Sequence, residues 1–74
     1  MRFSHHARNN MRLLGITTPE VRDFLASDAG WISLDPRGNI RVTGVIRGRG
    51  VRVVLASDDP GFAITVHEYR GGAW

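Results

Sequence analysis

The stretch that decides the fold is Ile40–Ala56, IRVTGVIRGRGVRVVLA, in which apolar and polar side chains alternate on both sides of a glycine-containing turn. Alternation with a period of two is typical of a half-buried β-strand. If Gly48 and Arg49 form a two-residue loop with glycine first, Ile46 lies opposite Val51. The stretch therefore predicts an antiparallel hairpin with one apolar face.

Two further strands are expected beside this hairpin. WISL at residues 31–34 precedes it, and FAITVHEY at residues 62–69 follows the turn SDDPG. That turn sets Leu55 opposite Phe62 and Val53 opposite Ile64. The apolar face of the resulting sheet then contains Ile40, Val42, Ile46, Val51, Val53, Leu55, Phe62, Ile64 and Val66.

The N-terminal part predicts two helices. Ser4 is expected to cap the first, over residues 5–14, whose apolar side chains recur at i, i+4 and i+7 as Ala7, Met11 and Leu14. Gly15 ends it. Thr18 is expected to cap a second, shorter helix with Pro19 at its first position. The fold class predicted is α+β, with two N-terminal helices packed on one face of a four-stranded antiparallel sheet.

The chain has 74 residues, enough for one domain over residues 1–69 with a short tail over residues 70–74. It contains no cysteine, so it has neither disulfides nor a thiolate zinc site. The start MRFSHH lacks the apolar segment of a signal peptide, and no apolar run is long enough to span a membrane. We expect a cytoplasmic protein, in whose tail Trp74 could stack on a base or dock on a partner.

All ten basic residues are arginine, against seven acidic residues, which gives a formal net charge of +3. Arginine binds phosphate in a bidentate manner and stacks on bases, so the set suits an acidic partner: RNA, DNA or an acidic protein. Codon bias in a GC-rich genome gives the same composition without any such function.

The other face of the predicted sheet is partly polar and basic, and no helix is left to cover it. It contains Arg41, Thr43, Val45, Arg47, Arg52, Val54, Ala63, Thr65, His67 and Tyr69. On the expected register Arg52 lies between Val45 and Thr65, with His67 further along the same strand. A functional surface and an ordinary solvated face both fit this pattern.

The adjacent histidines of the first helix point in different directions. His5 joins Arg8 and Arg12 in a basic stripe that suits phosphate and equally suits a solvated helix face. His6 borders the apolar stripe and can reach a sheet edge, where an imidazole can transfer protons near neutral pH. Neighbouring helical side chains diverge by about 100° and cannot both ligate one ion, so no metal site is expected.

Short segments at both ends of the chain share a pattern with a known bacterial family. Its residues here are Phe3, Ser4, His6 and Ala7 at the start, Gly15 and Ile16 after the first helix, and Ile64, Thr65 and Val66 in the last strand. They resemble the family called domain of unknown function 4258, which is related to the RelE and BrnT toxins. Leu14 departs from the pattern, because the family usually has an arginine directly before Gly-Ile. If the family's arginine at this position binds phosphate, Arg12 would have to take over that contact here.

The resemblance implies a RelE-like fold and a metal-independent ribonuclease, without cofactors, that a cognate antitoxin protein neutralises. Such an enzyme uses the RNA 2′-hydroxyl as nucleophile. His6 occupies the position of the family's histidine. Arg52, Thr65 and His67 join it by their position on the open sheet face, so the expected catalytic residues are His6, Arg52, Thr65 and His67. Arg52 and Arg41 would clamp the phosphate. The residues expected to bind nucleic acid are His5, Arg8, Arg12, Arg41, Arg47, Tyr69 and Arg70.

Two other classes of function fit the same residues. One is a binding module of the same fold that holds nucleic acid or an acidic protein without catalysis. The other is an interaction protein whose uncovered sheet face joins a second copy or a partner.

Overall fold

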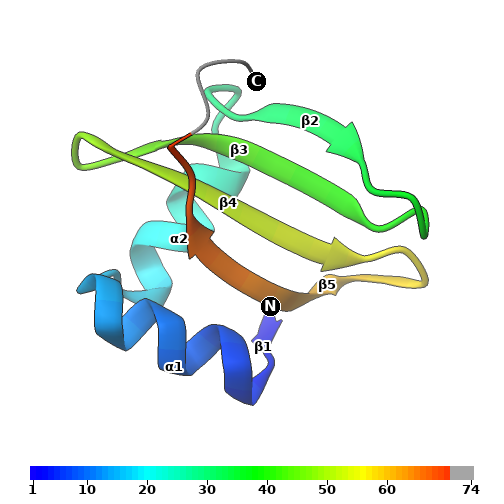
Figure 1. The fold of residues 1–74 in the computed structure, drawn as a ribbon, viewed down its shortest axis with the longest axis horizontal. Coiled ribbons are helices and arrows are strands. Elements are labelled where there is room, and N and C mark those ends of the chain that lie inside the picture. Colours follow the sequence, from blue (N-terminus) through cyan, green and yellow to red (C-terminus); the bar gives the residue numbers. More distant parts are fainter. Residues whose placement is uncertain (71–74) are drawn as a thin grey trace.

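The computed structural model describes residues 1–70 (Figure 1). Along the chain its elements are β1 (Arg2–Phe3), α1 (His5–Leu14), α2 (Thr18–Ala26), β2 (Trp31–Leu34), β3 (Ile40–Ile46), β4 (Arg49–Ala56) and β5 (Asp59–Glu68). The strands form one five-stranded sheet in the order β1-β5-β4-β3-β2. The α+β class with two helices is confirmed. In residues 1–70 neither helix is long and apolar enough to cross a membrane.

The prediction of a four-stranded, purely antiparallel sheet is wrong by one strand. β1 lies beside β5 and runs parallel to it, with Arg2 paired to Phe62 and Phe3 paired to Ala63. The backbone amide of Ser4 continues the ladder by donating to the carbonyl of Ala63 over 2.9 Å. A two-residue strand is too short to show alternation, so only its tertiary partner reveals it.

The helix ends follow the local capping chemistry. α1 begins after Ser4 and ends at Gly15, which has φ 70°, as predicted. α2 begins one residue earlier than predicted, because Thr17 rather than Thr18 is the N-cap. Glu20 stands three residues after Thr17 and accepts from its amide over 2.9 Å, while the Thr17 hydroxyl accepts from the Glu20 amide. This reciprocal capping box selects Thr17.

The β3–β4 hairpin turns at Arg47 and Gly48, which have φ of 51° and 77°. The predicted Gly48-Arg49 loop is therefore wrong, and Ile46 pairs with Arg49 instead of Val51. A two-residue turn with positive φ at both positions matches the right-handed twist of the strands. Each partner thus differs from the predicted one by two residues, so the side chains within β3 and β4 stay on their predicted faces. Arg47, predicted on the open face, lies in the turn instead.

The β4–β5 pairing also differs from the prediction. Val53 pairs with Val66, and Leu55 pairs with Ala63, with register shifts on either side of Leu55. The bulge turns Ala63 toward the helices, where it is fully buried; Phe62 and Ile64, expected on that face, are only partly buried. A small residue at this position leaves room for α1, which packs on β5.

The core lies between the helices and one sheet face. Its members are Phe3, Ala7, Met11, Ile16, Val21, Phe24, Val42, Ile46, Val51, Val53, Leu55, Ala63 and Val66. Phe24 of α2 lies over Gly44 of β3, since a Cβ added to that glycine would stand 2.6 Å from the ring. The absent side chain at Gly44 lets α2 pack close to the sheet.

Candidate active site on the open sheet face

Three polar side chains form a row across the sheet face that the helices leave uncovered, here called the open face. Thr43 of β3 pairs with Arg52 of β4, and Arg52 pairs with His67 of β5. The register expected from the sequence, with Arg52 between Val45 and Thr65, is wrong. Directly opposite residues on neighbouring strands have Cβ atoms about 4.5–5.5 Å apart. The true register therefore brings Arg52 beside His67.

The guanidinium of Arg52 is held at two points. Its Nε donates to Oγ1 of Thr43 over 2.9 Å, and its Cζ lies 4.1 Å from the centroid of the Tyr69 ring. Thr43 is only 1% exposed, so its hydroxyl is a fixed acceptor beneath the arginine. A cation over an aromatic face is attracted by the ring quadrupole. These contacts orient the side chain and leave both terminal amino groups without a polar partner in residues 1–70.

Gly50 sets the position of Tyr69. The amide of Tyr69 donates to the carbonyl of Gly50 over 2.8 Å. A Cβ added at Gly50 would lie 2.2 Å from the Tyr69 carbonyl oxygen, so only glycine permits this approach. The role of Gly50 has no local signal in the sequence, because it arises from a contact between residues far apart in the chain.

His6 reaches the same region from the start of α1. The Ser4 hydroxyl accepts from the Ala7 amide over 2.9 Å and donates to the carbonyl of Ile64, which fastens the start of the helix to the bulge in β5. His6 is exposed, and its Nε2 lies 3.4 Å from the Asn10 side-chain nitrogen. Three of the four matching residues at the start thus have structural contacts: Phe3 and Ala7 are buried, and Ser4 caps. His6 contributes nothing to the core.

His6 lies close enough to His67 to affect the pKa of its ring. Burial is the main cause that lowers the pKa of His67 below its ordinary value of 6.5, and the charges of Arg52 and His6 lower it further. Arg52 and His6 therefore both lie close enough to His67 for their charge to disfavour protonation of its ring. His67 is neutral at pH 7 and able to accept a proton.

A titration of the imidazole protons by NMR should give His67 a pKa below 6.5. Replacing Arg52 with methionine should raise that pKa because one repelling charge is lost, whereas His5→Ala should not move it. Since the folded protein binds this proton less readily than the unfolded chain, stability should fall as pH drops below about 6.5. A His67 pKa at or above 6.5 would contradict the arrangement.

The other predicted site residues of the sheet are less close to this row. Thr65 lies on the open face of β5, two residues before His67 and opposite Val54. Arg41 is directed toward β2, since its Nε donates to Oγ of Ser33 over 3.2 Å and its Nη2 donates to the Leu34 carbonyl over 3.1 Å. The structure thus separates Arg41 from His67.

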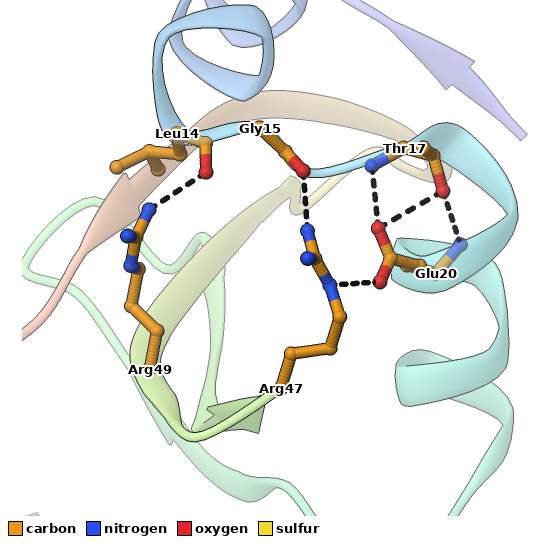
Figure 2. Close-up of polar contacts among 6 residues, drawn as sticks. All are labelled: Leu14, Gly15, Thr17, Glu20, Arg47 and Arg49. Carbon is orange, nitrogen blue, oxygen red and sulfur yellow. Dashed lines mark hydrogen bonds and ion pairs between the residues drawn. The ribbon is translucent and has the colours of Figure 1, made fainter.

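Arg47 belongs to a different group of contacts, shown in Figure 2. Its guanidinium donates to the carbonyl of Gly15 and forms an ion pair with Glu20, and Nη1 of Arg49 donates to the carbonyl of Leu14 over 2.6 Å. Carbonyls at a helix C-terminus lack partners within the helix. These two arginines bind those of α1 and hold the hairpin against it.

The remaining predicted nucleic-acid contacts lie outside the Thr43–Arg52–His67 row. His5, Arg8 and Arg12 are exposed on α1 and form no ion pair within the described part of the chain. Nε of Arg70 lies 3.2 Å from Oε1 of Glu68. Trp74 lies outside the described residues, as does the rest of the predicted tail after Arg70.

No three of the His, Asp and Glu side chains within residues 1–70 are grouped so that they could hold a metal ion. A scan against protein-family models, a search of curated proteins and a search of solved structures each found no match to this chain.

Proposed function

We propose that this chain is a metal-independent, toxin-like ribonuclease that cleaves RNA at the open face. The observation that supports the proposal best is the convergence of His6, Arg52 and His67 from three separate elements. Two imidazoles and a fixed guanidinium are the groups that this reaction needs: an acid, a base and a donor to the phosphate. The proposal includes a cognate antitoxin protein that neutralises the enzyme.

The proposed reaction uses only groups of the RNA and of the protein. The neutral ring of His67 accepts the proton of a 2′-hydroxyl, whose oxygen attacks the adjacent phosphorus. The bond between phosphorus and the 5′-oxygen breaks, and the leaving oxygen takes a proton from His6. The products are a 2′,3′-cyclic phosphate and a 5′-hydroxyl, and the charges balance when the two rings exchange their protons with water.

Arg52 supplies the electrostatic part of the mechanism. Charge builds up on the non-bridging phosphate oxygens as the fifth oxygen bonds to phosphorus. The terminal amino groups of Arg52 would donate to these oxygens, while Thr43 and Tyr69 hold the guanidinium in place. A preoriented donor needs no reorganisation when the charge develops. Arg41, bound to β2, is no longer assigned to the phosphate.

The test is induced expression of the wild type and of the triple variant His6→Ala, Arg52→Ala, His67→Ala, with growth and total RNA followed together. We expect growth arrest and RNA cleavage from the wild type alone. The matched control is Arg22→Ala, which removes an exposed guanidinium outside the proposed site and should behave as wild type. Arrest and cleavage by the triple variant would overturn the assignment of the site.

A second function, nucleic-acid binding without cleavage, is favoured by the exposed His5, Arg8 and Arg12 stripe. Intact RNA and healthy cells with the wild type, together with salt-dependent binding of the purified protein to RNA, would support it.

A further inference from the structure

The two edges of the sheet are protected very differently. β1 closes one edge with only two residues, and its Arg2 forms an ion pair with Asp59. β2 forms the other edge, the one farthest from α1 (Figure 1), and its four residues include neither a charge nor a proline. Natural sheets usually guard such an edge with charges, prolines or bulges, because its backbone groups can pair with another strand. An unguarded edge indicates an interaction surface.

Three of the four side chains of β2 are large, apolar and exposed, and they lie on both faces of the sheet. Trp31 is 61% exposed, Ile32 is 70% exposed and Leu34 is 62% exposed. Ile32 pairs with Val42 and Leu34 pairs with Ile40, so both lie on the face that the helices cover further along the sheet. They extend the core face beyond α2, which packs on β3. Large exposed apolar side chains gathered on one edge strand indicate a contact surface more than singly scattered ones do.

We propose that β2 is a homodimer interface, in which two copies of this chain join their β2 strands antiparallel across a two-fold axis. Residues that pair across strands lie on the same face, which restricts the register. An axis through Ser33 sets Ile32 opposite Leu34 of the second copy. The two copies then form one continuous sheet with a strip of four aliphatic side chains across the junction.

The charges at the ends of β2 favour a second copy over an unrelated protein. Asp28 is exposed shortly before the strand and Arg37 is exposed shortly after it, and neither forms an ion pair within the described residues. Antiparallel pairing about Ser33 places the turn that carries Asp28 in one copy beside the turn that carries Arg37 in the other, twice per dimer. The edge is thus complementary to itself, which a two-fold interface requires.

The small area of the β2 surface determines the expected affinity of the dimer. A four-residue strand with three large apolar side chains buries less than the ~1,600 Å² of a standard interface, which places it among transient contacts. We expect a dimer that dissociates at low concentration, with a Kd on the order of 10–100 µM.

Sedimentation equilibrium from about 1 µM to about 500 µM is the test. The wild type should approach twice the 8.2 kDa of one chain, while Ile32→Lys should remain at 8.2 kDa because it buries two charges beside the axis. The matched control is Leu13→Lys, which adds the same charge at a residue that is 77% exposed on α1, and it should dimerise as the wild type does. Circular dichroism confirms that each variant is folded.

A charge exchange tests the register itself. Asp28→Arg alone and Arg37→Asp alone should each weaken the dimer several-fold, since each sets like charges together, and the double exchange should restore it. A wild type that stays monomeric at the highest concentration overturns the proposal. So does a dimer that Ile32→Lys leaves intact, or a double exchange that fails to rescue. None of these outcomes depends on RNA cleavage.

Discussion

Replacing His67 with glutamine is expected to lower kcat/KM for RNA cleavage by about 10²–10⁴-fold, the range typical for loss of a general base. Glutamine retains a polar side chain of similar reach on β5 but cannot take the 2′-hydroxyl proton at neutral pH. Arg52→Met should cause a loss of about 10²–10³-fold, because an apolar side chain replaces the donor to the phosphate. Both substitutions affect partly exposed residues, so the fold should persist.

The measurement is the initial rate of cleavage of a fluorogenic RNA oligonucleotide in the presence of EDTA, with Arg22→Ala as control. The wild-type rate should rise with pH as His67 loses its proton, with a midpoint below 6.5, and His67→Gln should abolish this rise. The losses from His6→Ala and His67→Ala should not multiply in the double variant, since the two rings act as one unit. Undiminished cleavage by the double variant would show that the reaction occurs elsewhere.

Replacing Phe24 with alanine is expected to remove about 3–5 kcal/mol from the free energy of unfolding. Domains have about 0.05–0.15 kcal/mol of stability per residue, which gives this chain roughly 4–11 kcal/mol in total. The Phe24 ring lies over Gly44, and no neighbouring Cβ there can fill the cavity that alanine leaves. The variant should therefore lose a large fraction of its stability and unfold at a clearly lower urea concentration than the wild type.

Urea denaturation followed by circular dichroism gives the free energies directly. Phe62→Ala is the matched control, because this phenylalanine is partly exposed at the start of the bulge and has Arg2 5.5 Å from its ring centroid. Its loss should be about 1 kcal/mol, near the centre of the range for single substitutions. Similar losses in the two variants would contradict the central place given to Phe24 in the core.

Most of the elements could be predicted because their signals are local. Ser4 and Gly15 delimit α1 through their own backbone and side-chain chemistry, and both ends are as expected. The faces of β3 and β4 were also predictable despite the wrong loop, because an error of two residues preserves side-chain alternation. For this reason Arg52 and His67 could be assigned to the open face before their neighbours were known.

Contacts between distant segments were not predictable in the same way. β1 exists only because β5 offers an edge, and the bulge at Ile64 is fixed by the hydroxyl of Ser4, a residue 60 positions away. The sequence pattern placed Arg47 on the basic sheet face and Arg49 in a loop, but both bind carbonyls at the end of α1. The sequence alone does not indicate which carbonyl groups an arginine side chain can contact.

The sequence by itself determined the helices, the four longer strands and most of the open face, because periodicity and capping act over a few residues. Ala63 and Arg47, predicted on that face, contact the helical side of the molecule instead. The tertiary structure alone decided that Arg52 stands between Thr43 and His67, and that His6 lies close enough to affect the pKa of His67. The physical reason is that register depends on turn geometry and on a bulge held from the other end of the chain. A shift of two residues leaves the pattern unchanged and yet replaces every neighbour.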